Sequence, residues 1–491
     1  MNNEFDNVQT ESKKSFDMKK ALPFIIISAV VVVAIIVLAV VLPNVFGKKT
    51  EEVNLFHEDL VCFYDGEEWG YANKKGKKVI TAKFAEAYAF ADNGLALVSK
   101  DGEKYGYIDK KGDFKIKAKY QEATGFYPNG LAVVMNDKGE VGAIDKNGDT
   151  VIEFKYSYIG KFNEEGLAVV GKYSDKDGKV LYGVVDSKGE PVFAVKYEDI
   201  KLPNKSGSTV AKKDDTWGIL NKKGEWTVKP RYASATAFDD YNLTIVTNKD
   251  GEYGVLDVKG NTVVKLSYDY ITPFSETDGL AFFQEDDKWG IVNTKGKEIV
   301  EADYDNVVSV FRDGIAIVED GNDYQAIDTK GDEIFEFDDC KPIYGYFNGL
   351  VLVQELRKDD KEGKYGFMDT KGDLVIDFEY YAAYPFTMGY FANSMDPTEY
   401  APVMDDEYCG FIDKKGNEVI ALDYDDLLGF FSDGYAVVYE ESDKEDGDDK
   451  CIILNSKGGV VFSGCVDVEF EVGYWSIEAD ISSILDDYLD D

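Results

Sequence analysis

Histidine and cysteine, the side chains that most often bind metals or act as nucleophiles, are few in this chain of 491 residues. The single histidine, His57, has no cluster of Cys, Asp or Glu at ligand spacing beside it. The sequence therefore indicates neither a zinc site nor a histidine-based catalytic triad. The five cysteines form neither a CxxC pair nor a regular series, and they stand at Cys62, Cys340, Cys409, Cys451 and Cys465. Their spacing indicates no zinc knuckle and no disulfide framework, although a bridge between Cys451 and Cys465 stays open.

Carboxylates are abundant, with 94 Asp and Glu residues, and a glycoside hydrolase needs only two of them at the right separation. The acids that recur in this sequence occupy predicted turns, where Asp and Asn have a structural use. Phosphate-binding loops are missing too, because neither a P-loop motif nor a GxGxxG motif after a strand occurs. We therefore predict no enzyme, no catalytic residue, no metal ligand and no cofactor. An envelope glycosidase with paired carboxylates is kept as a remote alternative.

One acidic segment, residues 443–449, contains the oxygen donors that calcium prefers, with a glycine among them. The segment lacks the ordered ligand positions of an EF-hand loop. A flexible acidic loop and a calcium site both stay open as interpretations of this segment.

The balance of 94 acidic against 54 basic residues gives a formal net charge of −40. A field of this sign repels polyanions, so nucleic acid and anionic lipid headgroups are poor candidate partners. A basic protein, a neutral glycan or bound cations stay open as partners. A solvated acidic face is the simpler explanation of the charge.

An uncharged apolar segment, residues 21–42, is long enough at 1.5 Å per residue to cross a hydrocarbon core of about 30 Å. A secretory signal would have a shorter apolar region followed by a small-residue cleavage site. Four lysines precede the segment and only two follow it before acidic residues begin, and this bias places the N-terminus in the cytoplasm. We therefore predict a cytoplasmic tail over residues 1–20, a transmembrane helix over 21–42 and a linker over 43–55. The rest of the chain would lie outside a cell membrane that it crosses once.

A short motif returns along the chain with a nearly constant period. Its first copy reads Trp69-Gly70-Tyr71-Ala72-Asn73-Lys74-Lys75-Gly76, and residues 105–112 and 217–224 match it closely. Its last glycine recurs at Gly76, Gly112, Gly148, Gly189, Gly224, Gly260, Gly296, Gly331, Gly372, Gly416 and Gly458. The spacing is 35 or 36 residues in regular copies and 41 to 44 where loops have grown. This period predicts about eleven tandem β repeats over residues 56–465.

Each repeat is interpreted as three short strands. In the second copy, the apolar run 95–98 and the segment 105–109 flank a tight turn at Asp101-Gly102, which predicts a hairpin. A second turn follows at Asp109-Lys110-Lys111-Gly112, where the Asp bonds its own downstream backbone and the glycine takes a positive φ. The third strand, 114–120, alternates apolar residues with lysines, which predicts one buried face and one solvent-exposed face. The prediction is a small three-stranded antiparallel meander in each repeat.

The motif resembles that of the WG-repeat family, named for a Trp-Gly pair that stands here as Trp69-Gly70, Trp217-Gly218 and Trp289-Gly290. Other copies depart from the pair, with Tyr for Trp at Tyr105, Tyr182, Tyr253, Tyr324 and Tyr365, other residues at Val141 and Cys409, and no glycine at Gln325 and Ile452. The resemblance implies a bacterial envelope or surface protein with a binding role, and it supplies no catalytic residues. A glycine beside a large ring suits close backbone approach, so we expect these rings in the core. Exposed rings that stack on glycans are the alternative.

A lysine precedes the turn glycine in ten of the eleven copies, with Asn147 as the exception. At the spacing of about 4.8 Å in a tight β-helix these ammonium groups would repel one another. The predicted fold class is therefore an all-β tandem repeat, with three-stranded antiparallel meanders set in an open superhelix or a propeller-like array, although eleven units are many for one closed ring. Residues 466–491 are predicted to be a C-terminal cap, in which 479–489 form a short amphipathic helix.

The longest irregularity is an insertion at 387–406. It holds aromatic and methionine side chains that suit a binding patch, namely Met388, Tyr390, Phe391, Met395 and Tyr400. A loop that packs on itself is the alternative. The leading hypothesis is a surface-displayed binding or scaffolding module for an envelope protein or polymer, and a structural spacer or a partner-dependent sensor is the alternative. The sequence specifies neither the ligand, nor the binding residues, nor the oligomeric state.

Overall fold

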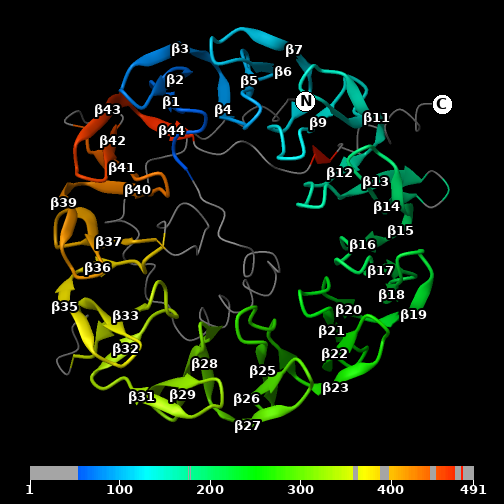
Figure 1. The fold of residues 1–491 in the computed structure, drawn as a ribbon, viewed down its shortest axis with the longest axis vertical. Coiled ribbons are helices and arrows are strands. Elements are labelled where there is room, and N and C mark those ends of the chain that lie inside the picture. The colour runs from blue at the N-terminus through cyan, green and yellow to red at the C-terminus, as the bar shows by residue number, and fades with distance from the viewer. Residues whose placement is uncertain are drawn as a thin grey trace, which may run out of the picture.

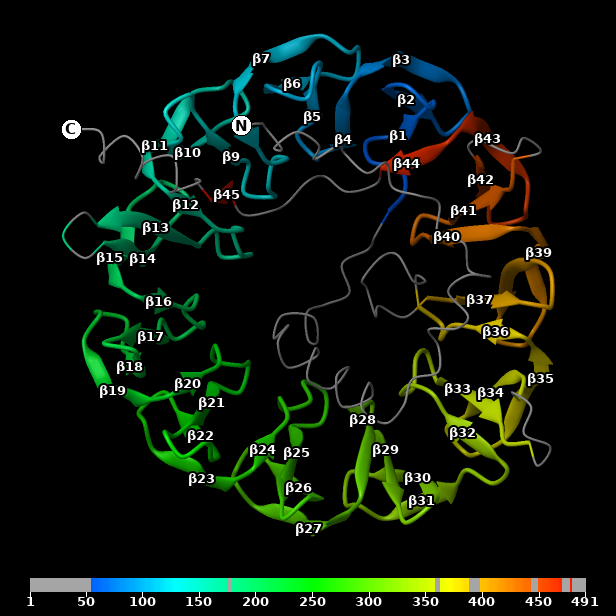
Figure 2. The ribbon, with the colours of Figure 1, turned by 180° about the vertical axis from the view of Figure 1, so that it is seen from behind.

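The strands of this chain form eleven antiparallel sheets that stand side by side around a ring (Figure 1). The computed structural model describes residues 54–174, 176, 178–357, 363–387, 398–442, 449–469 and 477–478. Each sheet is one blade of an eleven-bladed β-propeller, and Figure 2 shows the same ring from behind. The predicted all-β repeat fold is confirmed, and the arrangement is the propeller-like one of the two alternatives.

The predicted tail and transmembrane helix, residues 1–20 and 21–42, lie outside the described residues, as does most of the predicted linker 43–55. Among the residues that the structure does describe, none belongs to a helix with the length and apolarity needed to span a membrane.

Two strands of each blade lie toward the ring axis. The innermost strands of blades 1 to 11, in that order, are β44 (Asp467–Glu469), β4 (Glu86–Phe90), β8 (Glu122–Ala123), β12 (Tyr158–Ile159), β16 (Asp199–Ile200), β20 (Ser234–Ala235), β24 (Tyr270–Ile271), β28 (Asn306–Arg312), β32 (Cys340–Pro342), β36 (Ala382–Ala383) and β40 (Asp426–Phe430). The second strands are β1 (Leu60–Tyr64), β5 (Ala96–Ser99), β9 (Ala132–Met135), β13 (Ala168–Ser174), β17 (Thr209–Lys213), β21 (Leu243–Thr247), β25 (Leu280–Glu285), β29 (Ile315–Asp320), β33 (Leu350–Glu355), β37 (Tyr400–Met404) and β41 (Tyr435–Glu440).

The other two strands of each blade lie toward the outside. The third strands are β2 (Trp69–Asn73), β6 (Tyr105–Ile108), β10 (Val141–Ile144), β14 (Lys179–Val185), β18 (Thr216–Leu220), β22 (Tyr253–Asp257), β26 (Lys288–Asn293), β30 (Asp323–Asp328), β34 (Tyr365–Asp369), β38 (Cys409–Asp413) and β42 (Lys450–Asn455). The outer strands are β3 (Lys78–Phe84), β7 (Phe114–Tyr120), β11 (Thr150–Tyr156), β15 (Pro191–Tyr197), β19 (Trp226–Tyr232), β23 (Thr262–Tyr268), β27 (Glu298–Tyr304), β31 (Glu333–Glu336), β35 (Leu374–Tyr380), β39 (Glu418–Tyr424) and β43 (Val460–Cys465).

The prediction of three strands per repeat is wrong, because every blade has a fourth strand nearest the ring axis. In six of the described blades this innermost strand has only two residues, as in β8, Glu122–Ala123. Two residues cannot show the alternation by which a strand is recognised in a sequence. The second, third and outer strands of each blade are those that the sequence predicted.

The glycine of the Trp-Gly motif lies opposite a bulge in the outer strand. In all nine blades that have it, the preceding residue pairs 15 positions further along the chain, as Trp69 does with Phe84. Two extra residues of the outer strand bulge at this point. A Cβ atom on Gly106 would stand 2.5 Å from the backbone nitrogen of Ala118. The predicted close approach of two backbones is confirmed, and glycine makes room for the bulge.

The two blades without this glycine support the same explanation. In blade 11, Ile452 stands in its place, and Cys451 pairs with Cys465, so only one extra residue bulges. In blade 8, Gln325 stands in place of the glycine and pairs with Glu336. The next residue, Ala326, pairs with Phe335, so the outer strand has no extra residue opposite Gln325. The size of the residue therefore decides how many outer-strand residues fit opposite it.

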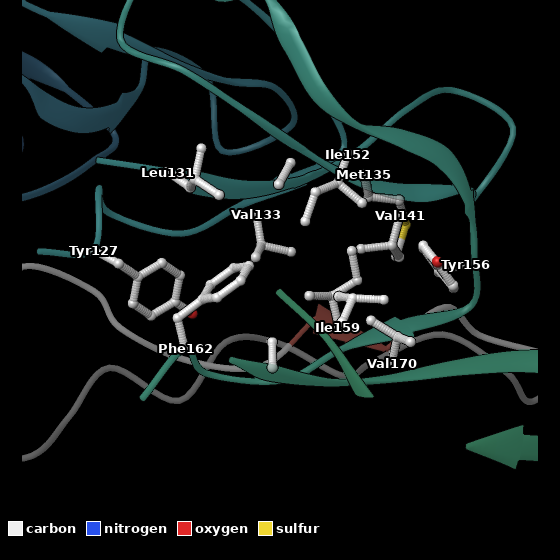
Figure 3. Packing of buried hydrophobic residues seen from close by; sticks show 13 residues of the cluster. Tyr127, Leu131, Val133, Met135, Val141, Ile152, Tyr156, Ile159, Phe162 and Val170 are labelled. Atoms are coloured by element: carbon white, nitrogen blue, oxygen red, sulfur yellow. The ribbon is translucent and has the colours of Figure 1, made fainter. Parts of the chain in front are cut away.

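The core of the ring lies between blades. Each of eleven apolar clusters joins the facing sides of two neighbouring blades. Figure 3 shows the cluster between blades 3 and 4, where the rings of Tyr127 and Phe162 meet edge to face with centroids 5.5 Å apart. Val133 of β9 and Ile159 of β12 belong to the same cluster. A blade that buries its faces only against its neighbours depends on the complete ring for stability.

The ring closes in blade 1, whose innermost strand comes from the other end of the chain (Figure 1). β44 pairs with β1, placing Val468 opposite Phe63 and Asp467 opposite Tyr64. The closing cluster packs Phe63 and Val468 with Phe462 of blade 11. Of the predicted C-terminal cap, residues 467–469 thus complete a blade and do not cover an open end.

The rest of the predicted cap, residues 466–491, is described only at β45 (Ile477–Glu478), which adds a fifth strand to the inner edge of blade 4 by pairing with β12. The segment 479–489, predicted to be helical, lies outside the described residues.

Candidate binding surfaces

The turns between the third and outer strands are built in the same way in all eleven blades. In blade 1, Asn73 Oδ1 accepts the backbone N–H groups of Lys75 and Lys77 at 3.0 and 3.1 Å. The same pair of bonds is made by Asp109, Asp145, Asp186, Asn221, Asp257, Asn293, Asp328, Asp369, Asp413 and Asn455. The prediction that this Asp or Asn is a turn residue is confirmed. We call the side of the ring that carries these turns the motif face.

The glycine that ends each of these turns also contacts the preceding blade. Gly112 has a φ of +81°, and a Cβ there would lie 3.1 Å from Cγ2 of Ile80 in blade 1. Across the closing junction, a Cβ on Gly76 would lie 2.1 Å from the carbonyl oxygen of Val461 in blade 11. The glycine therefore serves both the turn conformation, as predicted, and the blade junction, which the sequence did not indicate.

The rings of the Trp-Gly motif belong to the core. Trp217 and Trp289 are each 8% exposed. Trp289 meets Tyr270 edge to face at 5.9 Å, and Trp69 packs on Tyr64 at 5.2 Å. These contacts favour the predicted packing role over stacking on a glycan.

Acids on the opposite side of the ring, which we call the hairpin face, are bound to turn backbone. After the outer strands of blades 4, 6, 7 and 10, one acid caps the hairpin turn of the next blade, as when Asp305 Oδ2 accepts the N–H of Gly321 at 2.7 Å. The others are Glu198, Asp269 and Asp425. The Lys288 ammonium, 2.6 Å away, and this N–H hold the pKa of Asp305 below its usual range. The bonds to turn backbone give these four carboxylates a structural use.

The five cysteines are buried and form no disulfide. Burial raises the pKa of the Cys340 thiol to about 11 and that of Cys409 to about 12. Cys465 Sγ donates a hydrogen bond to the carbonyl oxygen of Cys451 at 3.4 Å, so the bridge left open by the sequence is not formed. Thiols that stay protonated at neutral pH are poor nucleophiles and poor metal ligands.

Two carboxyl groups with a raised pKa lie in the turns between the innermost and second strands of blades 6 and 7. Burial raises the pKa of Asp239 to about 6, although its Oδ1 accepts the N–H of Leu243 at 2.8 Å. Burial and the nearby Asp240 and Asp239 raise the pKa of Glu276. The Tyr241 hydroxyl donates to the carbonyl oxygens of Ser275 and Glu276 at 3.0 and 2.7 Å. We call Asp239, Asp240, Tyr241 and Glu276 the inner-turn cluster.

The inner-turn cluster has one property of an acid catalyst, because a carboxyl with a raised pKa can hold a proton at neutral pH. Its hydrogen bonds are nevertheless those of a turn, and the Tyr241 hydroxyl joins the turns of two blades. Nothing in the sequence indicated this cluster beyond the adjacent acids, since burial of Asp239 follows from the packing of neighbouring turns.

The other candidates from the sequence gather into no site. His57 is half-buried and its backbone pairs with that of Leu60 at 2.9 Å. Over the described part of the chain, no three His, Cys, Asp or Glu side chains are placed to hold a metal ion. Residues 443–448 of the acidic segment and 388–397 of the insertion lie outside the described residues. Tyr400, in the second half of the insertion, packs on Phe430 with ring centroids 4.2 Å apart and so joins the core.

The family described as WG containing repeat matches nine segments of the chain. They are residues 69–103, 105–139, 142–176, 182–217, 217–252, 253–289, 289–324, 365–396 and 410–442. The chain belongs to this family. Each family repeat spans two blades of the ring, since residues 105–139 contain β6 and β7 of blade 2 together with β8 and β9 of blade 3.

Two solved structures have a loosely similar arrangement to this WG-containing repeat protein. "Crystal structure of the eukaryotic initiation factor" has a TM-score of 0.41 and 10% identity, covering 85% of this chain and 97% of that one. "The crystal structure of BamB from Moraxella catarrhalis" has a TM-score of 0.27 and 13% identity, covering 58% of this chain and 95% of that one. A comparison with curated proteins gives no match. Similarities this weak add nothing to the family assignment.

Proposed function

We propose that this WG-containing repeat protein is a membrane-anchored binding or scaffolding module that acts outside the cytoplasm on an envelope protein or polymer. The observation that supports the proposal is a closed ring of eleven blades that repeats one turn around its motif face, with an exposed lysine in ten of the eleven turns. A rigid, repeated surface engages several units of a partner at once, and weak contacts then add up through avidity.

The proposal assigns no catalytic role to the ring. The described cysteines are buried thiols, and four acids of the hairpin face, Asp305 among them, are bound to turn backbone. In the inner-turn cluster, the Asp239 carboxyl accepts the Leu243 N–H within its own turn, and the Tyr241 hydroxyl joins two turns. A binding surface needs none of these groups to react.

The anchor in this proposal is the apolar segment 21–42, and the ring begins about a dozen residues later, since the structure describes the chain from Asn54. A linker of this length keeps the ring close to the bilayer surface. A partner of the ring would therefore lie in the envelope, near the membrane.

The test is binding of the full chain, held in detergent or lipid nanodiscs, to purified cell-wall polymers and to isolated envelope proteins. We expect saturable binding to at least one of them. Deleting residues 388–397 tests the insertion predicted to form a binding patch, and deleting 358–362, which joins β33 to β34 in the neighbouring blade, is the matched control. A full chain that binds none of these partners would favour the spacer or sensor function instead.

The position of the anchor needs its own measurement. Protease added to intact cells should cleave the ring and spare a tag fused before Met1. Protection of the ring from this protease would contradict a location outside the cytoplasm.

A further inference from the structure

The negative charge of this chain is unevenly distributed along it. Residues 51–270 contain 32 Lys and Arg against 36 Asp and Glu. Residues 271–491 contain 16 Lys and Arg against 54 Asp and Glu. The second segment thus carries nearly all of the net charge, and it contains blades 7 to 11 of the ring together with β44, β45 and residues outside the described part of the chain.

The outer strands show the same division on one kind of surface. Those of blades 1 to 6 carry ten exposed basic side chains and one exposed acid, Glu153. We call the ten residues the basic arc: Lys78, Lys83, Lys115, Lys117, Lys119, Lys155, Lys196, Lys229, Arg231 and Lys265. Those of blades 7 to 11 carry nine exposed acids and no basic residue. We call the nine residues the acidic arc: Glu298, Glu301, Asp303, Glu333, Glu336, Asp377, Glu379, Glu418 and Asp423.

The packing of a blade does not explain this division. In blades 1 to 5 the base directly before the last ring of the outer strand lies over that ring, as Lys119 Nζ does at 5.0 Å from the Tyr120 centroid. In blade 6 Lys265, three residues before Tyr268, does the same. Such a contact contributes about 0.5 to 1 kcal/mol at an exposed site. The same position holds Asp303, Glu379 and Asp423 in blades 7, 9 and 10, beside an equivalent tyrosine. The blade therefore folds with either charge.

Carboxylates in and beside the acidic arc repel one another. Glu336 is exposed to solvent and has a raised pKa, caused first by the charge of Asp323 and also by Asp338 and Glu333. This repulsion is relieved when a cation approaches. The acidic arc is thus suited to a basic partner surface.

The strands with the most charged residues of each sign lie on opposite sides of the ring. β7 carries three lysines, and β27 carries three acids. Figure 1 shows β7 at the top of the ring and β27 at the bottom. A ring with opposite charges on opposite sides matches a second copy of itself placed edge to edge.

We propose that the outer wall is a self-complementary interaction surface, through which the basic arc around β7 of one copy docks against the acidic arc around β27 of a second copy. The contact is head-to-tail, so each docked copy keeps one arc available for another. Rings then associate in rows. This inference is independent of the ligand in the proposed function, since it uses the rim of the ring and neither of its faces.

A second copy accounts for both arcs, whereas an anionic polymer would use the basic arc alone. The contact is expected to be weak and sensitive to salt. Exposed ion pairs contribute about 0.2 to 1 kcal/mol each, and the screening length falls from about 30 Å at 0.01 M salt to about 3 Å at 1 M.

The test compares self-association of the full chain in detergent by sedimentation at low and high salt. Two variants reverse one arc each: Lys117→Glu with Lys119→Glu, and Glu301→Lys with Asp303→Lys. They leave Lys115 and Glu298 in place, because Lys115 binds Asp109 at 2.9 Å and Glu298 accepts the Tyr268 hydroxyl at 2.6 Å. We expect the wild type to associate at low salt and each variant alone to associate at least tenfold more weakly.

An equimolar mixture of the two variants should restore association, because each then supplies the charge that the other lacks. This rescue separates lost pairing from misfolding. The control variant, Lys188→Glu with Lys457→Glu, makes the same change in net charge as the variant of the basic arc, but on the motif face, and should associate like the wild type.

The proposal is overturned by a wild type that stays monomeric at low salt, by a mixture that does not recover, or by a control that loses association equally. Binding of polyphosphate to the basic arc of a monomeric wild type would instead identify an anionic polymer as the occupant.

Discussion

At the scale of single residues, the glycine of the Trp-Gly motif shows how a missing side chain shapes a strand. Two extra residues fit into the outer strand opposite this glycine. One extra residue fits opposite Ile452, and no extra residue fits opposite Gln325. The glycine therefore sets the length of the outer strand. The bulge in turn carries the exposed side chains of the ring's wall.

Replacing Gly106 with Ala should destabilise blade 2 by about 1 to 3 kcal/mol, because the new Cβ would stand 2.5 Å from the backbone nitrogen of Ala118. Hydrogen exchange of the amides in β6 and β7 measures the local loss. Deleting Ala118 from this variant recreates the shorter bulge of blade 11 and should recover part of it. A double variant no better than the single one would contradict the bulge explanation.

A second residue, Asp239, predicts a dependence on pH. Its pKa is raised to about 6 in the fold from 3.8. Because the pKa of Asp239 is raised by folding, its contribution to the free energy of unfolding is fully present below pH 3.8. That contribution is lost as the pH rises through about 6. Asp239→Asn keeps the acceptor for the Leu243 N–H and removes the charge. This variant should be more stable than the wild type at pH 8, by on the order of 2 kcal/mol.

The advantage of Asp239→Asn should shrink as the pH falls below 6, and chemical unfolding at pH 8 and pH 5 measures it. Asp240→Asn, a change at the exposed neighbouring residue, is the control and should alter stability little. An advantage that is the same at both pH values would argue against titration of Asp239.

At the scale of elements, the sequence could predict whatever a repeating pattern displays. The third and outer strands, the turn that joins them and its Asp or Asn were all predictable, because alternation and turn chemistry recur in every copy. The two-residue innermost strands, such as β8, were not, because their pairing depends on the neighbouring second strand. β44 was not predictable either, since it pairs with β1 across the whole length of the chain.

The closing strand can be tested with a buried charge. Val468 is 6% exposed in the closing cluster, whereas Val460, at the start of β43, is 63% exposed. Val468→Asp should destabilise the closing junction by about 3 kcal/mol or more, because the carboxylate loses its water without a partner. Val460→Asp, the matched control, should cost little. Thermal unfolding and protease sensitivity of the full chains measure the difference.

At the scale of the whole molecule, ring size was the property that the sequence left open. Closure depends on eleven blade junctions together, and no single repeat encodes the number. Of the candidate binding surfaces, the motif face could be predicted from the repeated turns. The two charged arcs could not, because they appear only once the outer strands are placed around one ring.

Removing one whole repeat tests how far the ring can adjust. Deletion of residues 217–252 joins Thr216 to Tyr253, so that β17 pairs with β22 in a chimeric blade. We expect a closed ring of ten blades, nearer to the usual 4 to 8, which electron microscopy can count. Deletion of 217–234, which removes half a period, should abolish folding. A ten-repeat chain that unfolds would show that eleven is a fixed number.

Because β44 follows every strand of blade 11 in the chain, blade 1 is begun first and completed last. Until β44 has been synthesised, β1 presents an unpaired inner edge. A product truncated before β44 would keep that edge exposed, and proteases or chaperones that recognise such edges would act on unfinished rings. Pairing of β1 with β44 therefore distinguishes a closed ring from an incomplete one.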